Sequence, residues 1–142
     1  MNADASSKKD RVTIILHSGA YDRASYALSI ALVALSSGMK VHLLLTYEGL
    51  RRFTKGRLSD IGEETPATLR PDIEMGLEIG IIQPLDQQLA EAKKLGLRIY
   101  ACPNAIASLN IHPSHLQPEV DEVMGLAAFL ELARTASVNW YI

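Results

Sequence analysis

The stretch that decides the fold is VTIILHSGAYDRASYALSIALVALSSGMKVHLLL, residues 12–45. Its short apolar runs, VTIIL (12–16) and VHLLL (41–45), predict strands that are buried on both faces. Between them, Asp22 is expected to cap the start of a helix and Gly38 to end it. The helical period of about 3.6 residues is carried by apolar side chains: Ala24, Ala27, Leu28, Ala31, Leu32 and Leu35. A strand, a helix and a strand in this order predict a right-handed crossover and a parallel sheet.

The rest of the chain extends this unit into a three-layer α/β/α domain over residues 11–142. Residues 1–10 are polar without periodicity and are expected to form a disordered tail. The further predicted elements are helices at 47–53, 84–96, 103–109 and 126–133 and strands at 97–101, 120–124 and 138–142. Residues 54–82 show no sustained period, so they are either a surface excursion or a lid or oligomer contact.

Composition narrows the class of function. The 142 residues include 14 basic and 16 acidic side chains, and the resulting charge of −2 does not suggest a nucleic-acid partner. No apolar run approaches the roughly 18 residues of a membrane span. The polar start MNADASSKKD lacks the apolar centre of a signal peptide, so we expect a cytoplasmic protein.

The carboxyl ends of parallel strands open on one edge of a sheet, and ligand sites of open α/β folds lie in the crevice there. We therefore expect the residues that follow each predicted strand to gather at one edge. They are His17, Ser18 and Gly19, then Thr46, Tyr47, Glu48 and Gly49, then Cys102, and finally Met124 and Gly125.

Cys102 is the only cysteine, and it lies in RIYACPNAI (98–106), where a predicted strand turns into a helix. Unpaired amides and the helix dipole at such a position favour the thiolate and lower the thiol pKa from about 8.5. A free cysteine is also often a small buried hydrophobic residue. Both interpretations stay open. A lone cysteine can form neither an internal disulfide nor a CxxC pair.

The four histidines give weaker signals. His17 could supply a proton or a positive charge at the edge, or it could cap the first helix. His42 lies within a strand and is interpreted as a hydrogen-bonded polar residue that faces a helix. His112 and His115 are three residues apart without a third ligand, so no metal site is predicted.

Two further groups are interpreted as structural. A cluster of basic side chains is expected to form a solvated helix face, although it could guide an anionic donor or an acidic partner: Arg51, Arg52, Lys55 and Arg57. Trp140 and Tyr141 in the last strand are expected to pack against a helix or a neighbouring subunit.

Three segments together resemble the DsrE/DsrF/DsrH family, in particular its DsrE-like "peroxiredoxin-family" branch of sulfur-oxidising archaea and bacteria. They are VTIILHSGAYDRASYALSIALVALSSGMKVHLLLTYEGL (12–50), AKKLGLRIYACPNAIASLNI (92–111) and VDEVMGLAAFLELARTASVNWYI (120–142). The resemblance implies a parallel five-stranded sheet, a homo-oligomer and a cytoplasmic sulfur carrier. The acting cysteine of the family lies in a Y-A-C segment, which corresponds to Tyr100, Ala101 and Cys102.

The resemblance further implies that Cys102 carries a persulfide or a thiosulfonate. The implied partners are TusA-type carriers, rhodaneses or a heterodisulfide-reductase-like complex. Such a protein would be a carrier with possible sulfurtransferase activity, and no cofactor is expected.

Three functions are therefore carried forward. In the first, the Cys102 thiolate takes up sulfur, the amides of Asn104 and Ala105 stabilise the anion, and Ser18 and Gly19 complete a pocket with Tyr47 and Gly125 nearby. In the second, the edge binds a nucleotide, a flavin or another anion without a covalent step; HSGAYDR (17–23) carries neither a G-x-G-x-x-G nor a P-loop pattern. In the third, the chain is an assembly subunit with an inert thiol.

Overall fold

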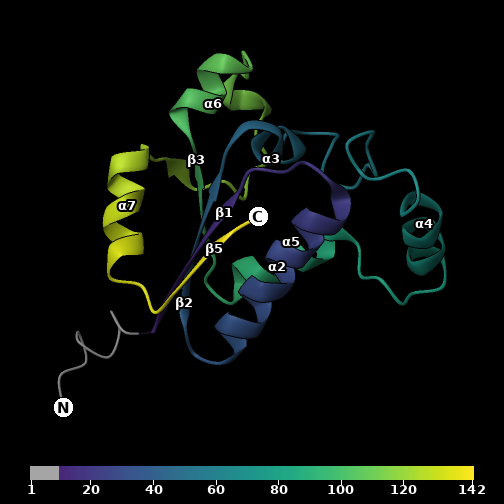
Figure 1. Ribbon diagram of the computed structural model, residues 1–142, viewed down its shortest axis with the longest axis horizontal. Coiled ribbons are helices and arrows are strands. Elements are labelled where there is room, and N and C mark those ends of the chain that lie inside the picture. The colour runs from purple at the N-terminus through teal and green to yellow at the C-terminus, as the bar shows by residue number, and fades with distance from the viewer. Residues whose placement is uncertain (1–9) are drawn as a thin grey trace.

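The computed structural model describes residues 10–142, so residues 1–9 of the expected tail lie outside the described part. Five strands form one sheet in the order β4-β3-β2-β1-β5, and every neighbouring pair is parallel (Figure 1). The strands are β1 (Arg11–Leu16), β2 (Lys40–Leu45), β3 (Arg98–Ala101), β4 (Glu122–Val123) and β5 (Val138–Tyr141). The predicted parallel five-stranded sheet is confirmed.

The helices lie on both faces of this sheet and at its carboxyl end. They are α2 (Tyr21–Ser36), α3 (Tyr47–Arg52), α4 (Arg70–Glu78), α5 (Leu85–Lys94), α6 (Pro103–Ser108) and α7 (Leu126–Arg134), with a 3-10 turn η1 (Pro113–His115). In Figure 1, α2 and α5 cover one face, α7 covers the other, and α6 stands above the end of β3. Among the described residues, no helix is both long and apolar enough to cross a membrane.

The core centres on a row of apolar side chains across the middle strands. In the register of the sheet, Leu43 of β2 lies opposite Ile14 on one side and Ile99 on the other, and all three are fully buried. Burial of each such side chain contributes about 1.5–3 kcal/mol. Trp140 continues the row beside Ile14, but it is 45% exposed because β5 is the edge strand.

Two local expectations need correction. The cap of α2 is Ala20, and Asp22 lies inside the first turn without a capping hydrogen bond, where its charge still favours the helix dipole. The strand predicted at 120–124 shrinks to two residues, because a carboxylate oxygen of Asp121 accepts the Ile99 amide at 2.8 Å in place of a backbone carbonyl. Gly38 does end α2, at a φ of +85°.

The long segment 54–82 is organised by Arg52, which was expected on a solvated face but is only 2% exposed. Its guanidinium donates to the Gly19 carbonyl at 2.6 Å and to four carbonyls of the following loop. These carbonyls belong to Arg57 (3.1 Å), Leu58 (3.1 Å), Asp60 and Ile61 (3.0 Å). The planar, five-donor shape of arginine suits such a set of acceptors. Sequence periodicity misses this role, because a run of cations looks the same whether or not one member turns inward.

The charge of Arg52 is balanced within the same loop. Glu64 lies 3.8 Å from the guanidinium, and the ring of Tyr21 lies 5.5 Å beneath it. Burial nevertheless lowers the pKa of Arg52, and the nearby Glu64 carboxylate partly opposes this shift. Beyond the loop, the excursion contains α4, which stands away from the three layers (Figure 1). One helix of nine residues agrees with the expected helical turns.

His42 is hydrogen-bonded, as expected. Its Nδ1 lies 2.6 Å from the hydroxyl of Tyr100, whose ring in turn packs edge-on against Phe129 of α7. Burial lowers the pKa of His42 to about 4, and the nearby Arg11, Arg98 and Lys40 lower it further in the same direction. The imidazole is therefore neutral in the native protein at neutral pH.

We expect Arg52→Lys to lower the free energy of unfolding by about 3 kcal/mol. A lysine ammonium has fewer donors than the planar guanidinium and would leave buried carbonyls without hydrogen bonds. Arg51→Lys is the matched control, since Arg51 forms a half-exposed ion pair with Glu48 and its replacement costs less than about 1 kcal/mol. Urea unfolding measures both. Hydrogen exchange should accelerate at residues 57–62 in Arg52→Lys alone, and equal losses in the two variants would contradict the role of Arg52.

Stability should also fall in mild acid because of His42. The unfolded histidine binds a proton near pH 6.5 and the native one only near pH 4, so the free energy of unfolding decreases as the pH falls through this window. Since the ring is partly exposed, we expect a loss of at most about 3 kcal/mol. Urea unfolding between pH 7 and pH 4 should show a shallower slope for His42→Gln. The slope should persist in His112→Gln, which changes an exposed histidine.

Candidate functional site

The expected edge is assembled by backbone hydrogen bonds between the carboxyl ends of neighbouring strands. Four amides at these ends donate across to the next strand: Met124 to Ala101 (3.0 Å), Cys102 to Leu45 (3.0 Å), Thr46 to Leu16 (3.1 Å) and His17 to Ile142 (2.7 Å). Cys102 and His17 therefore follow strands on either side of β2. Strands are spaced by about 4.8 Å, which puts the two backbones about 10 Å apart, with Tyr47 between them.

Cys102 heads helix α6. It is the N-cap residue in an extended conformation, and Pro103 follows at the first helical position, where its missing N–H costs no hydrogen bond. Its carbonyl accepts the amides of Ala105 and Ile106, both at 3.1 Å. The Ala105 amide is thus engaged and is not free for a sulfur anion, unlike the expectation. Within the described residues, the Asn104 amide makes no backbone hydrogen bond, and the Asn104 side chain is exposed.

The residue Cys102 is buried, with 6% of its surface exposed, and it belongs to the apolar core. This burial restricts the access of a reagent to the thiol. The helix above it is short, and Ala105 is the only one of its residues that is buried. The site therefore contains a buried thiol directly before a short helix, in which Ile106 also packs, partly buried, against the core.

Tyr47 adopts a strained backbone next to His17. Its φ of 45° lies in the left-handed region, which is uncommon for a residue other than glycine and clusters at functional sites. The neighbouring Gly49 explains the turn: its amide donates to the His17 carbonyl at 3.0 Å, and a Cβ there would overlap the Leu16 carbonyl. Helix α3 is thereby held close against the end of β1.

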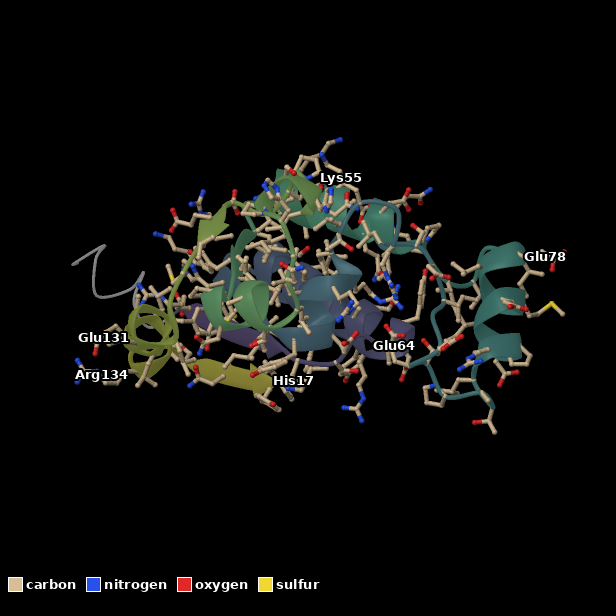
Figure 2. The ribbon with its side chains drawn as sticks, turned by 90° about the horizontal axis from the view of Figure 1, so that it is seen from above. His17, Lys55, Glu64, Glu78, Glu131 and Arg134 are labelled. Atoms are coloured by element: carbon tan, nitrogen blue, oxygen red, sulfur yellow. The ribbon has the colours of Figure 1, made fainter. Side chains whose placement is uncertain are left out.

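Three aromatic rings meet at this corner of the edge. The His17 ring lies 5.3 Å from that of Tyr47 and 6.1 Å from that of Tyr141, centroid to centroid. Figure 2 shows His17 beside β5. From the sequence, Tyr141 is expected only to pack against a helix or a neighbouring subunit, and its position near His17 is a finding of the structure. The alternating pattern of β5 could have indicated this position, because neighbouring residues of a strand point to opposite faces, so that Tyr141 lies on the face opposite to Trp140.

The remaining predicted residues make structural contacts. Ser18 accepts the Ala20 amide on its hydroxyl at 3.1 Å, which shapes the turn into α2. Gly19 is needed because a Cβ would lie 2.8 Å from the Glu48 carbonyl oxygen, and its own carbonyl binds Arg52. Gly125 is the N-cap of α7 and has open space around it. None of these contacts identifies a ligand.

Metal-ligating side chains do not gather in groups of three within residues 10–142. The rings of His112 and His115 lie 6.0 Å apart, and His112 accepts the Ser114 amide on Nδ1 at 3.1 Å. His112 thus caps the start of η1, and His115 is the last residue of that turn.

The family model of the DsrE/DsrF-like family matches residues 10–138. Among solved structures, the crystal structure of the ychN protein from E. coli aligns with a TM-score of 0.62 and 13% identity, covering 93% of this chain and 99% of that one. A protein of unknown function, MTH1491 from Methanobacterium thermoautotrophicum, aligns with a TM-score of 0.57 and 13% identity, covering 88% and 91%. No curated protein matches the sequence. At this identity the two structures establish the shared fold, and the family model establishes membership: the chain belongs to the DsrE/DsrF-like family.

Proposed function

We propose that the protein is a sulfur carrier that holds sulfur covalently on Cys102. The single observation that carries the proposal is the position of this cysteine, which heads a helix at the carboxyl edge of a parallel sheet in a DsrE/DsrF-like chain. Open α/β folds concentrate their ligand sites at this edge. A sulfur-relay role is consistent with the family.

The transfer step needs no cofactor. The Cys102 thiolate attacks the outer sulfur of a donor persulfide, the S–S bond of the donor breaks, and the donor leaves as a thiolate. Cys102 then carries a persulfide. In the reverse sense, an acceptor thiolate attacks the outer sulfur and Cys102 leaves as the thiolate. Each step moves one sulfur atom with no net oxidant or reductant.

A thiosulfonate forms by the same displacement. The thiolate attacks one central sulfur of tetrathionate, the central S–S bond breaks, and thiosulfate leaves with the electron pair. Cys102 retains the thiosulfonate group. Because the chain has one cysteine, no second thiol of the same chain can displace the adduct.

The edge offers polar groups to such an adduct. The Asn104 amide in the first turn of α6 is free of backbone acceptors, and Tyr47 and His17 lie one and two strands away on the same edge. In our proposal, the amide stabilises the anionic sulfur and His17 supplies a proton or a positive charge. Partners are thiol carriers of the TusA or rhodanese type, or a heterodisulfide-reductase-like complex, in the reducing cytoplasm.

We also propose that the carrier is a homo-oligomer. A groove of about 410 Å³ between α2 and β5 is lined by no charged side chain and ends at the sheet edge. Its lining includes Val33, which is 69% exposed, and Trp140. A second copy of the chain suits this groove, because two uncharged apolar surfaces meet without repulsion and without buried, unpaired charges.

The burial of Cys102 favours one alternative function. A thiol that is 6% exposed also fits an assembly subunit whose cysteine is inert. The two functions differ in one property, which is whether the folded protein reacts with sulfur donors.

We expect the folded protein to gain sulfur from glutathione persulfide and a thiosulfonate group from tetrathionate, at Cys102 alone. Intact-mass spectrometry measures the gain, and a thiol such as dithiothreitol should remove it. Cys102→Ser should gain nothing. If the native protein stays unmodified while the urea-unfolded protein reacts, the thiol is inert and the assembly subunit is the better interpretation.

Val33→Glu should shift the protein toward the monomer, because it puts an unpaired charge into the α2–β5 groove. Light scattering after size-exclusion chromatography measures the mass. Leu95→Glu is the control, since Leu95 is an exposed apolar residue outside this groove. A wild-type monomer would contradict the oligomer, and an unchanged Val33→Glu oligomer would contradict the surface.

A further inference from the structure

A second cavity lies where the C-terminal ends of α3 and α6 approach η1. Its volume is about 340 Å³. It is lined by Arg51, Thr54, Lys55, Arg57, Leu109, Asn110, Ile111 and His115. Three members of the basic cluster therefore converge on one hollow with a histidine, and no carboxylate lines it. In a chain whose net charge is −2, this is a local concentration of positive charge.

The backbone holds the walls of this cavity in place. The Lys55 amide donates to the His115 carbonyl at 2.7 Å, and Thr54 pairs with Leu116 in an isolated antiparallel bridge. Gln117 strengthens the contact from its backbone, which donates to Phe53 at 2.8 Å, and from its side chain, which donates to Thr54 at 3.1 Å. Segments about sixty residues apart are thus fixed to each other before any ligand arrives.

Two of the three cations of the cavity form no ion pair within the described residues. Among the ion pairs of the described residues, Arg51 has Glu48 at 3.1 Å, whereas Lys55 and Arg57 have no carboxylate partner. Nor are the side chains of these cations needed to cap the carbonyl at the C-terminal end of α3. The Arg51 carbonyl at the end of α3 already accepts the amide of Thr54 at 3.1 Å and its hydroxyl at 2.6 Å. Clustered cations, of which Lys55 and Arg57 are unpaired, repel each other and favour an anionic ligand.

A neighbouring cavity has the opposite character. It has a volume of about 600 Å³ and is lined by the carboxylates of Asp60, Glu63, Glu64 and Glu74, together with Arg57 and Arg70. Arg57 thus borders both cavities. Lys55 lines only the basic cavity, so its charge distinguishes the basic cavity from the acidic one.

We propose that the basic cavity binds a small organic anion. An anionic oxygen group, such as a sulfonate, phosphate or carboxylate, meets Arg51, Lys55 and Arg57, and a short apolar portion contacts Leu109 and Ile111. The volume lies at the lower end of the about 300–1,000 Å³ of ligand pockets, which favours a small molecule over a protein segment. The proposal does not depend on Cys102 chemistry.

The test uses the full-length, ¹⁵N-labelled protein and two-dimensional amide spectra at constant ionic strength. The probes are propane-1-sulfonate, sulfate and a hexaglutamate peptide. We expect propane-1-sulfonate to produce saturable shifts that concentrate at residues 51–57, 109–111 and 115, and to bind more tightly than sulfate. Cys102→Ser should bind equally well, which separates this site from the carrier function.

Charge-neutral variants assign the site. The double variant Lys55→Gln, Arg57→Gln should weaken propane-1-sulfonate binding about tenfold. The double variant Lys94→Gln, Arg134→Gln removes the same charge from other exposed positions and should bind as the wild type does. Shifts that do not saturate, equal losses in both variants, or equal affinities for sulfate and propane-1-sulfonate would overturn the proposal. Tighter binding of hexaglutamate, with shifts that extend beyond the cavity, would identify an acidic protein segment instead and would also overturn it.

Discussion

The guanidinium of Arg52 ties the carboxyl end of β1 to the long excursion. The guanidinium donates hydrogen bonds to the Gly19 carbonyl and to four carbonyls between residues 57 and 61. The loop therefore curls around a single buried charge. Because the charge is buried, each of these hydrogen bonds is costly to leave unmade. The same curl leaves Lys55 and Arg57 outside, where they line the basic cavity. The burial of Arg52 therefore determines where Lys55 and Arg57 lie on the surface.

Much of the fold could be predicted because it rests on local periodicity. The apolar runs at 12–16 and 41–45 and the helix between them require parallel pairing, and the order of residues along the carboxyl edge follows from it. The role of Arg52 could not be predicted, since burial of a charge depends on acceptors that the loop supplies only once it is folded. Asp121 is a similar case, because a side-chain oxygen replaces a strand carbonyl and shortens β4.

Some features of the candidate site can likewise be predicted from the sequence, and others cannot. Sequence reasoning puts Cys102, Tyr47 and His17 on one edge, and the backbone hydrogen bonds of the structure join that edge. It does not give the exposure of the thiol, which depends on packing between segments far apart in the chain. Nor does it give the left-handed backbone of Tyr47, which lies two residues before the close approach of Gly49 to Leu16. Residue order is a local property, whereas burial and strain are tertiary ones.

A buried thiol and a carrier function are compatible if uncovering the thiol is inexpensive. Local opening costs least where few apolar side chains are buried. Helix α6, which begins directly after Cys102, has six residues and fully buries only Ala105 among them. Its displacement would leave the row formed by Ile14, Leu43 and Ile99 intact, because these side chains lie between the central strands and the helices of the main layers. In the proposed carrier, the sheet maintains the fold, and local opening of α6 gives a donor access to the sulfur.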